Sequence, residues 1–459
     1  MNIKDMFSGK YPDDLNKSET RKKVIKIAWP ALVELFLVQL CTLIDNMMVG
    51  KLSPTALASV AYCTQPRFLL LCVFVALNSG ATAVIARYKG ANNKEDANEA
   101  FAQSLIMTFW MSIILSVTGY ICSERLVVFM GAESGLAIRY ATEYMQIQMA
   151  GFIFNALTLT ISAGLRGIGK TKISMYYNLT ANVINVILNY LLIYGKFGFP
   201  KMEVAGASLA TVIGQVVSFI IAAAVVMNKK SYLYVRFKSI VKINFDMCRK
   251  ILKIGIPAMG EQLMLRFGLI VYTLTVTSLG EKLYATHQTA LNIMGLSFMN
   301  GQAFGIAATS LIGQSMGYKR PDHGKAYTYE CRRYGMIFSI VLAIFLVVFN
   351  REIMSCFTDD EYIIDTGCKL LWIVAINQPI QAGQLIVSGA LRGAGDTMTV
   401  AVSTFLGMAI LRPIGSIIAV KVLGLGIMGA WAAVLIDQVV RSVIVYARFA
   451  GEKWKKIEI

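Results

Sequence analysis

The feature that most constrains this sequence is an apolar stretch of about 20 residues that recurs along the whole chain, and a helix of that length crosses roughly 30 Å of hydrocarbon. Of the 459 residues, 56% are apolar and only 15% are charged, with a mean hydropathy of +0.59. That balance is far from the composition of a water-soluble domain. No segment alternates with period two between turn residues, as a membrane β-strand would. We therefore expect an all-α polytopic membrane protein.

Hydropathy predicts twelve membrane-spanning helices. They are expected near residues 26–49, 56–86, 98–121, 138–163, 173–195, 204–228, 251–278, 285–314, 327–350, 363–390, 398–420 and 426–447. The polar residues 1–23 lack the apolar core of a signal peptide and are expected to form a cytoplasmic tail. Thirty basic residues lie in tails and loops on the side of the N-terminus, against nine on the opposite side. This bias predicts that both termini face the cytoplasm, and it accounts for the net charge of +17 without nucleic-acid binding.

A second constraint is an internal repeat, whose offset falls slowly from 227 to 223. The matches are Pro30 with Pro257, Glu34 with Glu261, Thr82 with Thr309, Gly90 with Gly317, the box 165–171 with 391–397, Gly206-Ala207 with Gly429-Ala430, and Gln215 with Gln438. Six helices in each half, an even number, give two lobes related by a parallel pseudo-two-fold axis along the membrane normal. The expected lobes are 24–228 and 251–459, joined by a cytoplasmic loop at 229–250. This architecture is typical of a two-lobed transporter.

Several short motifs resemble those of the multidrug and toxic compound extrusion (MATE) family. The segment 43–50, LIDNMMVG, is similar to the family's first-helix motif. The boxes Leu-Arg-Gly-x-Gly-x-Thr at 165–171 and 391–397 resemble its motifs after helices four and ten. NVILNY at 185–190 followed by VAGA at 204–207 resembles its passage from helix five to helix six. The resemblance implies a bacterial inner-membrane antiporter that exports amphipathic organic cations or drugs by alternating access, in exchange for Na⁺ or H⁺.

An ionisable side chain inside a bilayer is costly and therefore a candidate for function. Asp45 lies deep in the first helix, and the resemblance marks it as the cation-coupling acid and as a ligand for Na⁺ if that is the coupling ion. Asn185 and Asn189 are one helical turn apart and share a face. Their carbonyl oxygens could complete an ion shell, with Thr211 as a further candidate. Hydrogen bonding between helices without any ion explains the same residues.

Further polar residues are candidates for substrate binding or gating. Glu34 and Glu261 each follow a proline by four residues, so each acid lies beside a weakened helical turn. A hydrogen bond within one lobe that holds the bend is an equally good interpretation. Another family branch carries acids on helices seven and ten, where this chain has Leu265 and Gln381, so we expect coupling in the N-terminal lobe. The candidate substrate contacts on helix ten are Gln378, Gln381 and Gln384, although a simple polar contact between helices explains these residues equally well.

The remaining patterns exclude other classes of function. Residues 164–171, GLRGIGKT, fit a phosphate-loop pattern, but no strand precedes them, so we expect no nucleotide. Asp437 and Arg441 have the spacing of a structural salt bridge. The eight cysteines and two histidines are scattered, which favours neither an enzyme nor a cofactor. The alternatives are a lipid-linked saccharide flippase of the same superfamily and a non-transport membrane protein. We expect a monomer whose partners are organic cations and the lipid bilayer.

Overall fold

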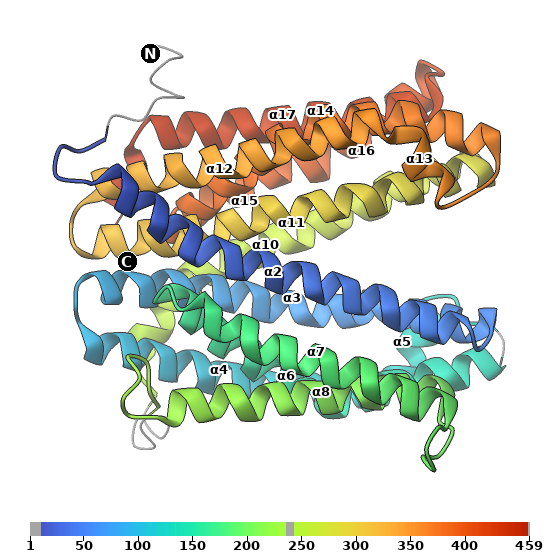
Figure 1. Cartoon of the computed structure of the whole chain (residues 1–459), viewed down its shortest axis with the longest axis horizontal. Helices are drawn as coiled ribbons and strands as arrows, with labels where there is room; N and C mark the ends of the chain where they lie inside the picture. Colours follow the sequence, from blue (N-terminus) through green and yellow to red (C-terminus); the bar gives the residue numbers. More distant parts are fainter. Residues whose placement is uncertain (1–10, 134, 236–242, 458–459) are drawn as a thin grey trace. The chain divides into compact units, whose positions relative to one another are not determined.

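The computed structural model describes residues 11–133, 135–235 and 243–457. In these ranges all twelve expected spans lie in long helical segments, and no strand is present (Figure 1). Eleven of the spans are continuous helices: α2 (Lys17–Gly50), α3 (Pro54–Gly90), α4 (Lys94–Ile121), α6 (Gly135–Gly167), α7 (Thr171–Tyr194), α8 (Glu203–Met227), α10 (Phe245–Thr277), α11 (Glu281–Gly317), α12 (Pro321–Val348), α14 (Glu361–Ala394) and α17 (Gly426–Ala450). The remaining span alternates between α-helical and π-helical turns: α15 (Thr397–Thr404), η1 (Phe405–Leu411), α16 (Arg412–Ile417) and η2 (Ile418–Val422). The fold class is therefore confirmed.

Several helices begin before the apolar stretches that predict them, and their additional first turns consist of polar residues. Helix α2 begins at Lys17, nine residues before its expected start at 26. The side chains of Asn93 and Asp360 cap α4 and α14 by accepting hydrogen bonds from backbone N–H groups of the first turn. Three short helices that hydropathy does not predict follow α4, α12 and α17: α5 (Ser123–Phe129), α13 (Asn350–Ser355) and η3 (Lys453–Lys456).

The outer surfaces of the helices are suited to lipid. Ten of the described helical spans are long and apolar enough to cross a membrane. On α4, Trp110, Ile114, Val117 and Ile121 follow one another at helical spacing and are each between 54% and 73% exposed. A continuous exposed apolar stripe of this kind is stable only when it faces an apolar medium. The chain is therefore a polytopic membrane protein.

By its internal contacts the chain divides into two compact units. The N unit comprises Val33–Lys89 and Asn93–Gly255, and the C unit comprises the residues up to Leu32, Gly90–Asn92 and those from Ile256 onward. The division falls inside α2 and α10, close to Pro30 and Pro257. The first half of α2 consequently packs with the C unit, whereas the expected lobes, 24–228 and 251–459, follow the order of the chain.

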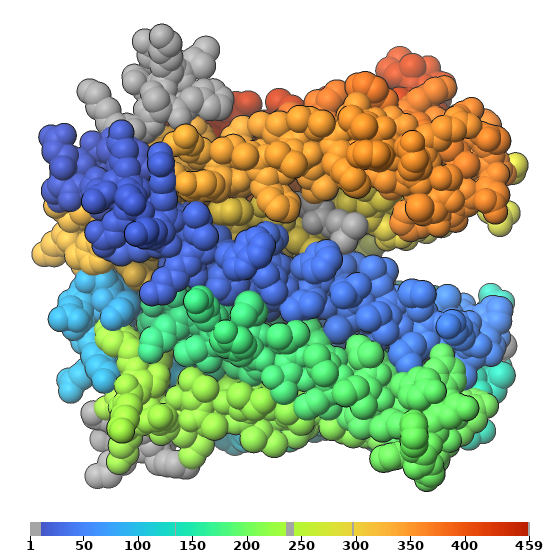
Figure 2. All heavy atoms as spheres, viewed as in Figure 1, coloured from blue at the N-terminus to red at the C-terminus, as the bar shows by residue number. Residues whose placement is uncertain are grey.

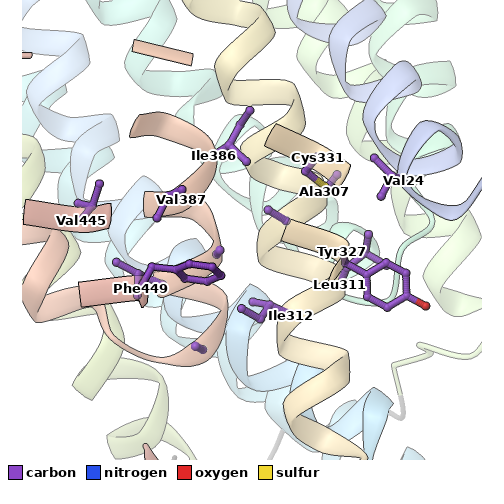
Figure 3. Close-up of a cluster of buried hydrophobic side chains, with 14 of the residues drawn as sticks. Val24, Ala307, Leu311, Ile312, Tyr327, Cys331, Ile386, Val387, Val445 and Phe449 are labelled. Atoms are coloured by element: carbon purple, nitrogen blue, oxygen red, sulfur yellow. The ribbon is translucent and has the colours of Figure 1, made fainter. Parts of the chain in front are cut away.

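Each unit has its own apolar core. In the C unit, Val24 of α2 lies among buried side chains of α11, α12, α14 and α17, including Leu311, Tyr327, Ile386 and Phe449 (Figure 3). In the N unit, buried residues of α3 and α6 form the centre, with Phe74 and Phe152 in edge-to-face contact. Helices α7 and α8, green in Figures 1 and 2, pack side by side on this unit.

The two glycine-rich boxes allow close helix packing. A Cβ atom on Gly167 would lie 2.9 Å from the backbone oxygen of Thr82, and one on Gly393 would lie 2.2 Å from that of Thr309. Thr82 and Thr309 are themselves repeat-equivalent. In both boxes the following glycine, Gly169 or Gly395, has a positive φ at the end of a helix. The box at 164–171 thus follows helix α6 rather than a strand, so it lacks the context of a phosphate loop.

Candidate functional site

The four residues expected to couple a cation come together in the N unit. Asn189 of α7 donates a hydrogen bond from Nδ2 to Asp45 Oδ1 of α2. The orientation of the Asn185 carboxamide that satisfies both of its ends brings its Nδ2 to 3.0 Å from Asp45 Oδ1. Its Oδ1 then accepts from Thr211 Oγ1 of α8 at 3.2 Å. One carboxylate, two carboxamides and one hydroxyl therefore form a single polar cluster.

Local packing explains this convergence. Asn185 and Asn189 lie one turn apart on α7, so both face α2 and α8. Gly214 of α8 lets that helix approach α7, because a Cβ there would lie 3.0 Å from the backbone oxygen of Ala181. Thr211, one turn before Gly214, is thereby placed beside Asn185. Asn185 and Asn189 are 7% and 0% exposed, whereas Asp45 and Thr211 are half-buried.

The cluster offers hard oxygen ligands. Asp45 supplies a carboxylate, and the Oδ1 of Asn189 is buried without a hydrogen-bond partner among the described residues. Na⁺ prefers oxygen ligands of these types, as other hard cations do. A carboxylate in the same place also carries a proton. The arrangement can therefore take up Na⁺ or H⁺.

Glu34 and Glu261, predicted to bind substrate or to gate, each form an ion pair inside one unit. Arg166 Nη2 lies 2.7 Å from Glu34 Oε1, which also accepts from Asn178 Nδ2 at 2.8 Å. In the C unit, Arg392 Nη2 lies 2.5 Å from Glu261 Oε1. The glutamates are 5% and 4% exposed. Of the two interpretations of these acids, substrate binding or gating on one side and a contact within one lobe on the other, the structure shows the contact within one lobe.

Neither arginine partner was predicted from the sequence, although the internal repeat contains a signal for both. Arg166 and Arg392 occupy the same place in the two glycine-rich boxes. The two glutamates likewise occupy the same place after the two prolines. Because each half therefore carries one acid and one base at equivalent positions, the repeat itself suggests that they pair.

The glutamines of α14 lie in the interior of the C unit. Gln378, Gln381 and Gln384 are 1%, 9% and 3% exposed. Gln384 donates to Ser388 Oγ at 3.0 Å and accepts from Gln438 of α17 at 3.5 Å. The Nε2 of Gln378 and the Oε1 of Gln381 have no hydrogen-bond partner within the described ranges. Glu261, the other candidate in this unit, pairs with Arg392.

The expected salt bridge between Asp437 and Arg441 is confirmed, with a separation of 2.9 Å between carboxylate and guanidinium. A second arginine, which the spacing could not reveal, contacts the same carboxylate. Arg412 Nη2 of α16 lies 2.7 Å from Asp437 Oδ2. Asp437, Arg412 and Arg441 are 0%, 4% and 7% exposed. This buried triad therefore carries two positive charges and one negative charge.

A group of possible metal ligands near the start of α12 in the C unit is already paired with an arginine. Asp14, Asp322 and His323 have ligand atoms near one another. Arg320 lies 2.8 Å from both carboxylates. Its hydrogen bond holds the pKa of Asp14 below its usual range. The charge of these acids is thus balanced by a side chain, and the group does not resemble a cation site.

Comparison with known proteins shows that the chain is similar to transporters. A family model described as MatE matches residues 30–191 and 257–418, two ranges separated by the same offset of 227. The chain is 28% identical over 438 residues to a probable multidrug resistance protein NorM of Thermotoga maritima, covering 95% of this chain and 94% of that protein. It is 27% identical over 432 residues to an uncharacterized transporter of Bacillus subtilis, YisQ, covering 94% of each.

Solved structures show the same fold. An outward-facing MATE family transporter of the MOP superfamily superposes with a TM-score of 0.88 at 22% identity, covering 95% of this chain and 97% of that one. A MATE structure described as being in the straight conformation gives a TM-score of 0.88 at 21% identity, with the same coverage of each chain.

Proposed function

Because the chain belongs to the MATE family of efflux transporters, we propose that it is a secondary active antiporter that exports amphipathic organic cations in exchange for Na⁺ or H⁺. It would act as a monomer in a bacterial inner membrane, with both termini in the cytoplasm. Drug extrusion is supported by its relatives, which are described as probable multidrug resistance proteins. The coupling ion and the class of substrate go beyond these descriptions and are part of our proposal.

The observation that carries the proposal is the cluster around Asp45. This acid of α2 shares its surroundings with two carboxamides of α7 and a hydroxyl of α8. A proton would need only the carboxylate, whereas Na⁺ would use the neighbouring oxygens as well. The partnerless Oδ1 of Asn189 favours Na⁺. Binding of the ion from outside would then favour release of the organic cation.

The paired glutamates take a different role in this proposal. A cationic substrate at Glu34 or Glu261 would have to displace an arginine that is already in contact with the acid. We therefore assign these pairs to gating, with the pairs intact in the arrangement seen here. The substrate would be held instead by neutral polar and aromatic groups, for which Gln378, Gln381 and Gln384 are candidates.

The experiment that tests the function is efflux of a fluorescent organic cation from cells with defined Na⁺ and pH gradients. Wild type would be compared at matched expression with Asp45→Asn, which removes the charge and keeps the shape. We expect gradient-dependent efflux from wild type and background efflux from the variant. Dependence on Na⁺ at constant pH would identify Na⁺ as the coupling ion, and the converse result would identify H⁺.

The matched control is Asp365→Asn, the same substitution at an exposed acid of α14 that pairs with Arg351. It should leave efflux unchanged. Full efflux by Asp45→Asn would overturn the proposed coupling site. No efflux by wild type across a panel of cations would instead favour the flippase of the same superfamily, which is assayed with a lipid-linked saccharide.

A further inference from the structure

The C unit contains a place that is equivalent, by the internal repeat, to the Asp45 cluster, but it carries a positive charge and hydrogen-bond donors instead of an acid. With the offset of 227 that relates Pro30 to Pro257, Asp45 corresponds to Tyr272 of α10. With the later offset of 223, Thr211 corresponds to Val434 of α17. Tyr272 and Val434 do pack together in one buried cluster, which supports the equivalence. The carboxylate of the N unit is thus replaced by a phenol.

A buried arginine side chain lies near this phenol. Between the boxes and α17 the offset falls from 226 to 223, so Asn189 corresponds to a position within residues 412–415. Arg412 lies in this range, and its guanidinium is 5.8 Å from the centre of the Tyr272 ring. The π-helical segments η1 and η2 flank Arg412. Such departures from α-helical geometry are frequent at functional sites.

The charges around Arg412 do not cancel. Arg412 and Arg441 share the single carboxylate of Asp437, and Glu261 is already paired with Arg392. These five groups leave one positive charge inside the unit. A Cβ on Gly407 would lie 2.1 Å from Asp437 Oδ1, so η1 packs closely against this carboxylate. An uncompensated charge in such a place is costly.

Beside this charge lie polar atoms that bind nothing. The Tyr272 hydroxyl, both ring nitrogens of His287 and Trp431 Nε1 have no hydrogen-bond partner among residues 11–133, 135–235 and 243–457. The three side chains are 0%, 0% and 1% exposed. The His287 ring lies 5.3 Å from that of Tyr272 and 5.7 Å from that of Trp431. Buried polar groups without partners are rare, and two such side chains packed on either side of a third, His287, indicate a ligand.

The hydrogen-bonding capacity of the three side chains defines the ligand. The phenol and the neutral imidazole each offer one donor, and the indole nitrogen offers only a donor. Three donors next to an excess positive charge suit an anion. Because the residues are fully buried, the anion must be small and free of its water shell. We propose that the C unit binds one chloride ion between Tyr272, His287 and Trp431, beside Arg412.

The three residues lie within the first or last two turns of their helices, next to the ends Thr277, Glu281 and Gly426. On the topology expected from the basic residues, these ends face the outside. Chloride from the medium would neutralise the buried charge and join the outer ends of α10, α11 and α17. This proposal does not depend on which substrate the protein transports.

The test is a chloride titration of the purified full-length protein in detergent, with sodium gluconate replacing sodium chloride at constant Na⁺ and ionic strength. The midpoint of thermal unfolding should rise with chloride and saturate, because a ligand that binds only the folded state stabilises it. Bromide should act similarly, and sulfate should not. A midpoint that is the same in chloride and gluconate would overturn the proposal, and is the result expected if only water fills the cluster.

Two variants localise the effect. Tyr272→Phe removes a hydroxyl that has no hydrogen-bond partner in the described part of the chain, so the variant should fold normally. It should weaken chloride binding about tenfold, the value of one hydrogen bond to a charged group. His287→Phe should act in the same direction. The control is Tyr284→Phe, a partly exposed ring 6.3 Å from His287, which should keep the wild-type response. An unchanged chloride response in the Tyr272→Phe/His287→Phe double variant would also overturn the proposal. Because no transport is measured, the result is independent of the efflux assay.

Discussion

At the scale of single residues, each unit contains a buried glutamate whose charge is balanced by an arginine from a distant part of the chain. Glu34 and Arg166 are separated by 132 residues, and Glu261 and Arg392 by 131. Each pair connects the region after a helix-interior proline to the end of the box-bearing helix. Removing one partner of such a pair leaves a buried charge without compensation, which costs far more than removing both.

The first prediction concerns the Glu34–Arg166 pair. Arg166→Gln should lower the free energy of unfolding by about 3–5 kcal/mol, because the Glu34 carboxylate would remain buried beside Asn178 alone. The double variant Glu34→Gln/Arg166→Gln should recover much of this loss. Chemical unfolding of the purified protein in detergent measures both.

The control for this prediction is Arg351→Gln, which breaks an exposed pair with Glu361 and Asp365. Its cost should stay below about 1 kcal/mol, as for other solvent-exposed ion pairs. If Arg166→Gln were as mild as this control, the pair would not be balancing a buried charge.

The residues of the Asp45 cluster could be selected from the sequence, whereas the contacts of other buried polar and charged residues could not. Asn185 and Asn189 were recognisable because a one-turn spacing puts two amides on one helix face. The contact between Arg412 and Asp437 joins two helices, and neither hydropathy nor spacing reports which helix faces meet. The cluster of Tyr272, His287 and Trp431 joins three. Only the internal repeat, by relating Tyr272 to Asp45, gives a sequence signal for it.

At the scale of elements, α11 and α14 share an extensive contact in the C unit, and it depends on glycines. A Cβ on Gly389 would lie 2.4 Å from the backbone oxygen of Gly305, one turn before the contact of Gly393 with Thr309. Thr309 Oγ1 also donates to Gly389 O at 2.7 Å. Small residues at such spacing let membrane helices approach closely.

The second prediction tests this packing. Gly389→Ala should destabilise the protein by about 1–3 kcal/mol or more, because backbone atoms of α11 cannot move aside as a side chain can. Gly260→Ala is the matched control, since no atom lies within 4 Å of the added Cβ on α10. That change should be neutral or stabilise by up to about 1 kcal/mol, the difference in helix propensity. Equal midpoints of thermal unfolding for the two variants would contradict the proposed role of the glycines.

Elements were well predicted in number and type and less well at their boundaries. Twelve apolar stretches gave twelve long helical segments, because a chain in lipid must satisfy its backbone hydrogen bonds locally. The polar first turns of α2 and α4 were missed because hydropathy records only the lipid-facing part of a helix. The π-helical turns of η1 and η2 were missed because α-helical and π-helical turns can be built from the same apolar residues.

At the scale of the whole molecule, two halves of one repeat carry opposite local charges. The N unit presents an acid with oxygen ligands at Asp45, and the C unit presents hydrogen-bond donors and an excess positive charge at the equivalent place. After duplication the two halves could change independently, because each forms its own core. Hydrophobic patterning was kept in both halves, which is why the repeat predicts the fold better than it predicts the chemistry of each site.

The last prediction concerns the orientation of the molecule in the membrane. The bias of basic residues predicts that the segment between α13 and α14 lies outside and the start of α4 in the cytoplasm. Cys356 is an exposed free cysteine in the first of these segments, and Glu95 is exposed in the second. A membrane-impermeant maleimide added to intact cells should therefore label Cys356, and the signal should be lost in Cys356→Ser. In the Cys356→Ser background, Glu95→Cys should be labelled only after the membrane is permeabilised. The reverse pattern would invert the topology, and with it the side from which a coupling cation reaches Asp45 and an anion reaches Tyr272.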